Sequence, residues 1–218
     1  MTGNFQKGVN IVLQVRLIVL TGSLSTLIAC SGSSNPANEA SLLTEEQLAV
    51  FVALGLQINE GDTPPDITGT YRIDPRLLST SSAPEFYDLV ETTFPSQNIT
   101  FAKQGPEALT ATVTEDGKDG AGFGDIVILG STITGTNNAF TTFQLSQVTF
   151  NGHTFEIAQA FSGNVAEGGI RNFQQANTVI DGNGDSGNHL IPDDTGNLFT
   201  DLDGITSRVT EAAVTDAK

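Results

Sequence analysis

The sequence predicts a mainly β domain: an antiparallel β-barrel of about eight strands with one N-terminal helix, or alternatively a β-sandwich. From residue 64 onward, clusters of Gly, Asn, Asp and Ser recur, and they separate short runs rich in Thr, Val, Ile and Phe. No such run is regularly followed by a helical pattern, which disfavours an α/β fold. The 23 Gly, 13 Phe and 38% apolar residues indicate a chain that folds around a core.

One helix is expected before the strands, within residues 41–61. Thr44-Glu45-Glu46-Gln47 has the form of a capping box, and leucines flank it at the positions of a hydrophobic staple. The apolar run over 48–56 predicts about three helical turns, which end near Gly61. We expect this helix to pack on the outside of the β domain or across one of its ends.

The β domain is expected over residues 62–210, with residues 211–218 as a C-terminal tail. Asn151-Gly152 between two apolar runs is a strong hairpin signal, and Thr136-Asn137-Asn138 marks a second tight turn. The alternation of apolar residues slips between Phe140 and Phe143, which predicts a β-bulge there. The expected strands cover residues 67–73, 98–103, 109–114, 125–135, 140–150, 153–161, 172–181 and 198–203.

Residues 1–29 predict a signal peptide for secretion. The only charges before Glu39 are those of Lys7 and Arg16, and a short apolar stretch over 17–29 follows them. A basic region followed by about 7–15 apolar residues is typical of a secretory signal, and it is too short for a membrane-spanning helix.

Leu27-Ile28-Ala29-Cys30 resembles the lipobox of bacterial lipoproteins. In those proteins cleavage falls before the cysteine, whose thiol is joined to a diacylglycerol. The resemblance implies that Cys30 is lipidated and that the lipid bilayer is a partner of the chain through this acylated residue. Burial of acyl chains contributes about 0.8 kcal/mol per CH₂, so two or three chains hold a protein firmly. The alternatives are an ordinary cleaved signal and an uncleaved signal anchor.

Residues 30–40 predict a flexible tether, because they are small, mostly polar and nearly uncharged. Ser31 follows the cysteine, at the position where an Asp is associated with retention in the inner membrane. The expected location is therefore the bacterial cell envelope, with a lipid anchor in the outer rather than the inner membrane.

The charge balance excludes some classes of partner. With 9 Lys+Arg against 25 Asp+Glu, the formal net charge is −16, whereas nucleic-acid binding needs a basic surface to displace counterions from phosphates. A single Cys excludes an intrachain disulfide and a Cys-based zinc cage. The two histidines, His153 and His189, are too few and too separated to indicate a metal site.

Pro64-Pro65-Asp66-Ile67-Thr68-Gly69-Thr70-Tyr71 resembles the opening of lipocalin-like barrels, in which Gly-x-Trp or Gly-x-Tyr begins the first strand. The usual Trp is replaced by Tyr71, and Arg208 is a candidate for the arginine that packs over this ring. The resemblance implies a barrel able to hold one small apolar ligand. Its motifs identify no ligand-binding residue beyond Gly69 and Tyr71 as the barrel-opening motif.

Further short motifs resemble uncharacterised envelope lipoproteins of Gram-negative bacteria. They are Phe161-Ser162-Gly163, the segment 169–173 and Asp201-Leu202-Asp203-Gly204. The two resemblances together cover residues 64–204.

An acidic segment near the C-terminus is a candidate calcium site. Asp181-Gly182-Asn183-Gly184-Asp185 places oxygen ligands at positions 1, 3 and 5 of an EF-hand-like loop, but position 12 is Pro192 instead of the bidentate Glu. A looser site would combine Asp181, Asn183 and Asp185 with Asp201 and Asp203. The alternative is a solvated acidic turn.

No catalytic constellation is apparent, so we expect no enzyme. Gly184-Asp185-Ser186-Gly187 resembles the nucleophile motif of chymotrypsin-like proteases, but the sequence lacks the matching histidine context. Two functions fit the sequence. The first is a non-enzymatic envelope lipoprotein that binds or carries a small hydrophobic molecule in a barrel interior. The second is a structural or adhesion module of the envelope with no internal ligand.

Overall fold

The computed structural model describes residues 42–102, 104, 110–115, 126–150, 153–182 and 192–210. The chain divides into two units, residues 1–39 and 40–218, and every described residue belongs to the second. The predicted signal peptide, Cys30, the whole predicted tether (30–40) and the predicted tail (211–218) lie outside the described residues. The described part of the second unit is mainly β, with one α-helix.

The helix α1 spans Glu45–Leu54. The predicted capping box is confirmed, because the Thr44 hydroxyl accepts a hydrogen bond from the Gln47 N–H and the Gln47 side chain accepts one from the Thr44 N–H. The predicted end near Gly61 is wrong. Gly55 stops the helix with a left-handed backbone (φ 93°), and its N–H donates to the Phe51 and Val52 carbonyls.

Twelve strands form one sheet in the described residues. The eight predicted strands are all present, as β2 and as β5 to β11, with shifted ends; β1, β3, β4 and β12 were not predicted. A short 3₁₀ helix, η1, covers Pro84–Leu89. The strands are β1 (Asp62–Thr63), β2 (Gly69–Ile73), β3 (Arg76–Ser81), β4 (Thr93–Phe94), β5 (Gln97–Ala102), β6 (Thr110–Glu115), β7 (Ile126–Thr136), β8 (Ala139–Phe150), β9 (His153–Ala166), β10 (Gly169–Asp181), β11 (Gly196–Asp201) and β12 (Ile205–Arg208).

The sheet branches at β10. One edge of β10 pairs with β9, whereas the other edge pairs with two strands placed end to end: residues 169–171 with β12, and residues 174–178 with β11. From β12 the sheet continues through β2 and β5 to β6, and from β11 it continues through β3 to β4. Asn172 lies between the two paired segments with φ 51°, and the register with β9 shifts there.

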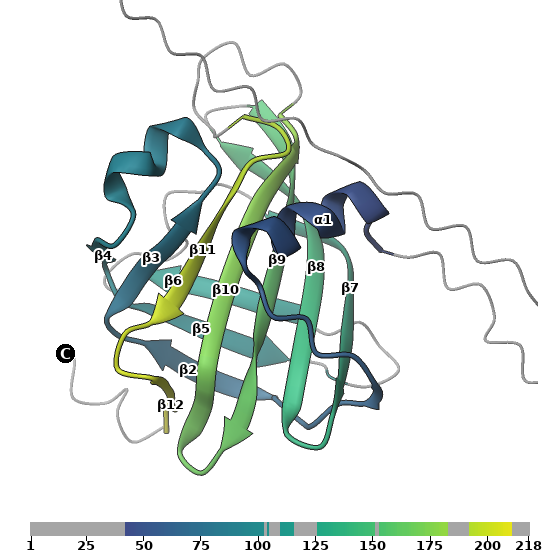
Figure 1. Cartoon of the computed structure of the whole chain (residues 1–218). Helices are drawn as coiled ribbons and strands as arrows, with labels where there is room; N and C mark the ends of the chain where they lie inside the picture. Colours follow the sequence, from purple (N-terminus) through teal and green to yellow (C-terminus); the bar gives the residue numbers. More distant parts are fainter. Residues whose placement is uncertain are drawn as a thin grey trace, which may run out of the picture. The chain divides into compact units, whose positions relative to one another are not determined.

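The predicted closed barrel of eight strands is wrong. The main path of the sheet runs from β1 and β7 to β6, and β6 does not pair with β7 among the described residues. Because β10 gives its second edge to two different strands, the β12–β2–β5–β6 branch turns away from the rest of the sheet. Figure 1 shows β2, β5 and β6 crossing behind β9 and β10.

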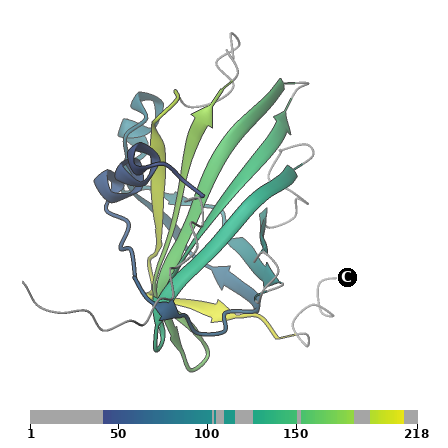
Figure 2. The same ribbon diagram turned by 90° about the vertical axis from the view of Figure 1, so that its right-hand side faces the viewer.

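The two parts of the branched sheet enclose an inner core. Tyr71 and Ile99 from the β2–β5 branch pack with Phe140 and Phe161 from β8 and β9, and all four are at most 1% exposed. The Phe161 ring lies 5.4 Å from the Phe101 ring, edge to face. We call the side of β8 to β11 that faces this core the inner face. Figure 2 shows the β2–β5 branch and α1 on opposite sides of the long strands.

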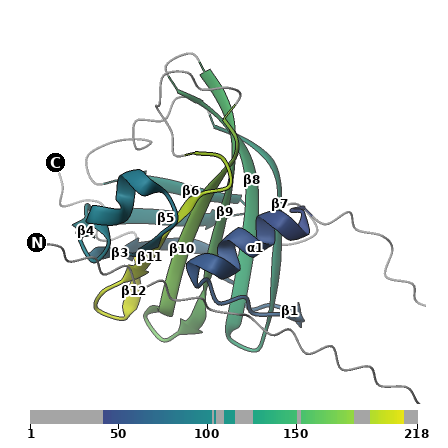
Figure 3. The same cartoon turned by 45° about the horizontal axis from the view of Figure 1, so that its top comes forward.

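The helix covers the opposite, outer face of the long strands, as expected for packing on the outside. Phe51 and Leu54 of α1 are buried against Phe143 of β8 and Ala160 of β9, and the Phe51 and Phe143 rings lie 5.9 Å apart. Figure 3 shows α1 lying across these strands. Each face of the central strands therefore carries a buried cluster, the inner core on one side and the packing against α1 on the other.

The two predicted hairpins are confirmed by register. Thr136 pairs with Ala139 around a turn in which Asn137 has φ 56°, and Phe150 pairs with His153. The predicted bulge in β8 is wrong, because the register between β8 and β9 is unbroken. The irregularity lies on β7 beside Leu129. The apolar slip in β8 arises because Phe140 faces the inner core and Phe143 faces α1.

Candidate functional site

A row of side-chain amides crosses the inner face of β8 to β11. Gln144 of β8 pairs with Gln159 of β9. Gln159 in turn pairs with Asn177 of β10, and Asn177 pairs with Asn197 of β11. Partners in an antiparallel register point to the same face, and Gln159 lies two residues from Phe161, which faces the inner core. We call these four residues the amide row; at about 4.8 Å between strands it spans about 14 Å.

Within the part of the chain that the structure describes, three buried oxygens in or beside the amide row have no hydrogen-bond partner. They are Thr142 Oγ1, Gln175 Oε1 and Asn197 Oδ1, and we call them the orphan acceptors. Their side chains are only 1%, 2% and 4% exposed. Thr142 and Gln175 both pair with Phe161, one from each side, so they lie on the inner face one step from the row toward the core. Each unpartnered buried polar atom costs about 1–3 kcal/mol.

Gln144 differs from the orphan acceptors because both its amide oxygen and its amide nitrogen are hydrogen-bonded. Its Oε1 accepts from the Ala111 N–H at 2.8 Å, and its Nε2 donates to the Ala111 carbonyl at 3.1 Å and to Ser146 Oγ at 3.3 Å. The Gln144 side chain thus bonds both the N–H and the carbonyl of Ala111 in β6, as the backbone of a neighbouring strand would. It fixes the position of the β6 backbone against this end of the amide row.

The middle of the amide row is accessible to solvent. Gln159 and Asn177 are partly exposed, although they lie on the central strands β9 and β10. The neighbouring residues Ala158 and Ala160 face the opposite side, where the packing that includes α1 buries them completely. The exposure therefore belongs to the inner face. The accessible amides of Gln159 and Asn177 are flanked by buried ones, and this arrangement suits a ligand that reaches the inner face.

A charged corner lies at the far end of β11. Arg76 of β3 pairs in register with Asp201, and its guanidinium lies 4.6 Å from the centroid of the Phe199 ring. Both charged side chains are buried, at 5% and 9% exposure. Thr206 donates a hydrogen bond to Asp201 Oδ2 at 2.7 Å. Burial raises the pKa of Asp201 to about 6 from its usual 3.8, and the neighbouring Asp203 adds to the rise.

This raised pKa predicts a pH-dependent effect of Asp201→Asn. The Asp201 carboxyl binds its proton more tightly in the folded protein than in the unfolded chain. The free energy of unfolding therefore falls as the pH rises from about 4 to about 6. Asparagine keeps an acceptor for Thr206 and removes this loss. We expect the variant to be more stable than the wild type by about 2 kcal/mol at pH 7.5 and nearly equal to it at pH 3.5, measured by urea unfolding. Asp88→Asn on the exposed η1 removes the same charge and serves as the control; an equal gain for Asp201→Asn at both pH values would contradict the prediction.

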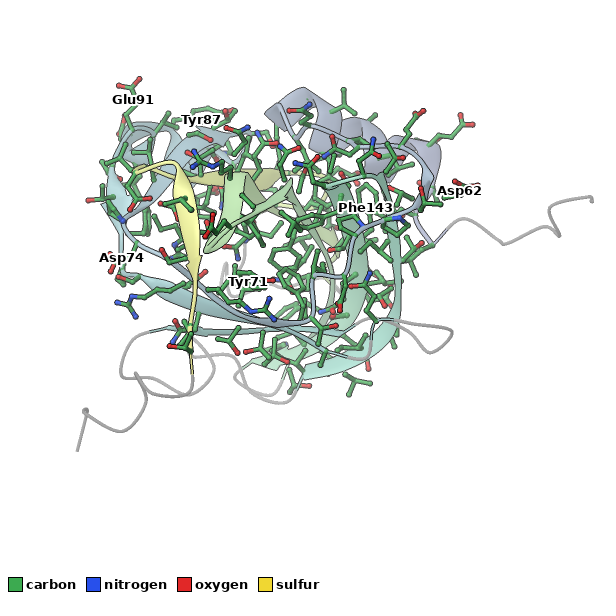
Figure 4. The ribbon with its side chains drawn as sticks, turned by 90° about the horizontal axis from the view of Figure 1, so that it is seen from below. Asp62, Tyr71, Asp74, Tyr87, Glu91 and Phe143 are labelled. Carbon is green, nitrogen blue, oxygen red and sulfur yellow. The ribbon has the colours of Figure 1, made fainter. Side chains whose placement is uncertain are left out.

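Gly69 and Tyr71 of the barrel-opening motif both lie next to the Arg208 side chain. The Arg208 guanidinium carbon lies 5.6 Å from the centroid of the Tyr71 ring, and Nη2 donates to the Thr68 carbonyl at 2.6 Å. A Cβ at Gly69 would lie 2.8 Å from Nη2, so the glycine makes room for this side chain. Burial raises the pKa of the Tyr71 phenol. In Figure 4, Tyr71 lies between the two parts of the sheet and Phe143 lies close to α1.

The candidate calcium ligands are not brought together where they are described. Asp181 is the last residue of β10, past Thr178, which pairs with Gly196 at the start of β11. Asp201 is the last residue of β11, so the length of β11 separates the two carboxylates. Asp203 lies close to Asp201. Asn183 and Asp185 lie outside the described residues. Within the described ranges no group of three His, Cys, Asp or Glu side chains is suited to a metal ion.

His153, His189 and the segment 184–187 were not predicted to form a site. His153 is exposed at the start of β9, where its ring stacks on Phe155 at 6.3 Å. The segment 184–187 and His189 fall outside the described residues. Among the helices of the described part, none is long and apolar enough to cross a membrane. Comparisons with family models, with curated proteins and with solved structures find no match to this chain.

Proposed function

We propose that the chain is a non-enzymatic, lipid-anchored protein of the bacterial cell envelope that binds a small molecule on the inner face of its sheet. The carrying observation is the set of three orphan acceptors beside the accessible amides of Gln159 and Asn177. Buried polar atoms are almost always hydrogen-bonded in folded proteins. Three such atoms next to an accessible surface support a ligand that supplies the missing donors.

The position of the ligand follows from the contrast between the buried aromatic core and the accessible, amide-bearing part of the inner face. The Phe side chains that a hydrophobic ligand would contact are in contact with one another: Phe101, Phe140, Phe161 and Phe173 are at most 1% exposed. The accessible part of the inner face carries amides instead. The ligand in this proposal therefore sits on the amide row, above the aromatic core and not within it.

The lipid anchor in this proposal rests on Cys30 and its lipobox-like context alone. We expect Cys30→Ser to move the protein from the membrane fraction to the soluble fraction of its host, because the acyl chains supply the binding energy. Intact mass spectrometry of the wild type should show the mass of two or three acyl chains on a chain that begins at Cys30. A variant that stays membrane-bound would contradict lipidation without bearing on the ligand site.

Native mass spectrometry of the full-length protein, extracted in mild detergent from its own host, tests ligand binding directly. We expect an added mass of a few hundred daltons that is lost on denaturation. Asn197→Leu removes one orphan acceptor and should reduce the occupied fraction. A protein that always carries its bare mass beyond the acyl chains would contradict the binding function.

A second candidate function, a structural or adhesion module, is favoured by the β7 edge. Ile126, Val127 and Leu129 are 49%, 54% and 49% exposed. Among the described strands, β7 has β8 on one side and only the two-residue β1 near its far end on the other. Exposed apolar edge strands are surfaces where other chains pair. Val127→Lys would weaken such an assembly, measured by light scattering, and would leave ligand occupancy unchanged.

A further inference from the structure

We infer that the amide row binds a neutral saccharide, which takes the three orphan acceptors as partners for its hydroxyl groups. This inference rests on the proposed function and names the chemical class of its ligand. It follows from the number of orphan acceptors, from the absence of charge in the row, and from the location of the row on a sheet face.

The orphan acceptors require a ligand rich in donors. Thr142 Oγ1, Gln175 Oε1 and Asn197 Oδ1 each lack a donor, and a purely apolar ligand would leave them unpartnered at a cost of about 1–3 kcal/mol each. A sugar hydroxyl donates one hydrogen bond and accepts others. A side-chain amide presents a carbonyl oxygen and an NH₂ group side by side, so it can bond two neighbouring hydroxyls of one sugar ring.

The site also favours a ligand without charge. None of the side chains of the amide row or of the orphan acceptors is ionisable, and buried charges need a partner of opposite sign. The net charge of the chain, −16, opposes the approach of an anion. Neutral hydroxyl groups satisfy amides without any counter-charge.

A peptide ligand fits this surface less well than a saccharide does. Extended peptides bind sheets by adding a strand at an edge, where backbone groups are free. β9 and β10 are central strands whose backbone groups are used in pairing on both sides. The row offers side chains only, and its span of about 14 Å at about 4.8 Å per strand accommodates a di- or trisaccharide.

The orphan acceptors give this inference a distinctive test. Gln175→Met and Asn197→Leu replace unpartnered polar groups with apolar groups of similar size, which is neutral or stabilising when no partner is lost. We therefore expect the ligand-free variants to melt at the wild-type temperature or above it, while saccharide affinity falls by at least about tenfold. Gln147→Met lies on the other face of β8 and is the matched control, with unchanged affinity.

The probes are neutral mono-, di- and trisaccharides of glucose, galactose, mannose and N-acetylglucosamine, each at about 10 mM, added to the full-length protein in a thermal-shift assay. A ligand that binds only the folded state raises the melting temperature. We expect at least one saccharide to do so, and its effect to disappear in Gln175→Met and Asn197→Leu but not in Gln147→Met.

Three outcomes would overturn the inference. The first is that no saccharide of the panel raises the melting temperature. The second is that the shift persists in both variants, and the third is that 1-dodecanol or trialanine amide gives a shift that the variants abolish while the saccharides give none. The third outcome would leave the proposed binding function standing with a different ligand class. A bare protein mass in native mass spectrometry, together with an unchanged melting temperature for every probe, would contradict both the saccharide inference and the proposed binding function.

Discussion

Replacement of Phe161 by alanine is expected to lower the free energy of unfolding by about 3–5 kcal/mol. The side chain is 0% exposed and belongs to the inner core. Its ring contacts Phe101 of β5 at 5.4 Å and Phe173 of β10 at 6.3 Å, so it joins the two parts of the branched sheet. Alanine would leave a cavity where three strands meet, and these rigid strands cannot collapse to fill it.

Urea unfolding of the full-length protein measures this loss, and Leu202→Ala is the control. Leu202 is 55% exposed in the turn after β11, so its truncation should change the stability by no more than about 0.5 kcal/mol. A loss below about 1 kcal/mol for Phe161→Ala would show that the two parts of the sheet do not share a close-packed core.

The second large effect is expected at Gly169, the first residue of β10. A Cβ at this position would lie 2.2 Å from the Thr206 carbonyl oxygen of β12, and Gly169 pairs with Ser207. The three nearest atoms, the Thr206 carbonyl oxygen and carbon and the Ser207 Cα, all belong to the backbone, so the contact cannot be relieved by a rotamer change. We expect Gly169→Ala to destabilise the protein by about 3 kcal/mol or more, because β12 must move away from β10.

The neighbouring Gly168 provides a matched control for this variant. Its φ is +83°, but nothing lies within 4 Å of a Cβ placed on it. Gly168→Ala should therefore cost only the left-handed backbone strain of about 1–2 kcal/mol. Urea midpoints distinguish the two variants, and limited proteolysis should cut the β12–β2 branch only in Gly169→Ala. Equal losses would contradict a tight β10–β12 contact.

The strands were predictable from the sequence where they are long and bordered by turn residues. All eight predicted strands exist, because Thr, Val, Ile and Phe favour extended backbone and Gly-containing turns separate them. The four missed strands are short or largely polar: β1 and β4 have two residues each, β12 reads Ile-Thr-Ser-Arg, and β3 reads Arg-Leu-Leu-Ser-Thr-Ser. No periodicity distinguishes such segments from loops.

The branching of the sheet and the candidate site depend on register, which local patterns do not encode. That β10 shares one edge between β11 and β12 is decided by tertiary packing, so the closed barrel was a reasonable but wrong expectation. Gln159 and Asn177 are visible in the sequence as polar residues within predicted strands, where Asn is uncommon, whereas Asn197 lies just before the predicted strand 198–203. Only the pairing of β9, β10 and β11 places these three residues in one row. Gly69 and Arg208, in contrast, were suggested by resemblance, and the structure places them in contact.

The branch at β10 also sets the order in which the domain can be completed. Strands β7 to β10 pair with their neighbours in the chain, so their loops close early and at low entropic cost. β2, near the start of the domain, instead pairs with β12, where Tyr71 meets Arg208 across more than half of the chain. A ribosome delivers β2, β5 and β6 first, yet these strands reach their place on the sheet only after β12 has emerged. We therefore expect this half to fold last, so that the domain stays incompletely folded until its final strand is available.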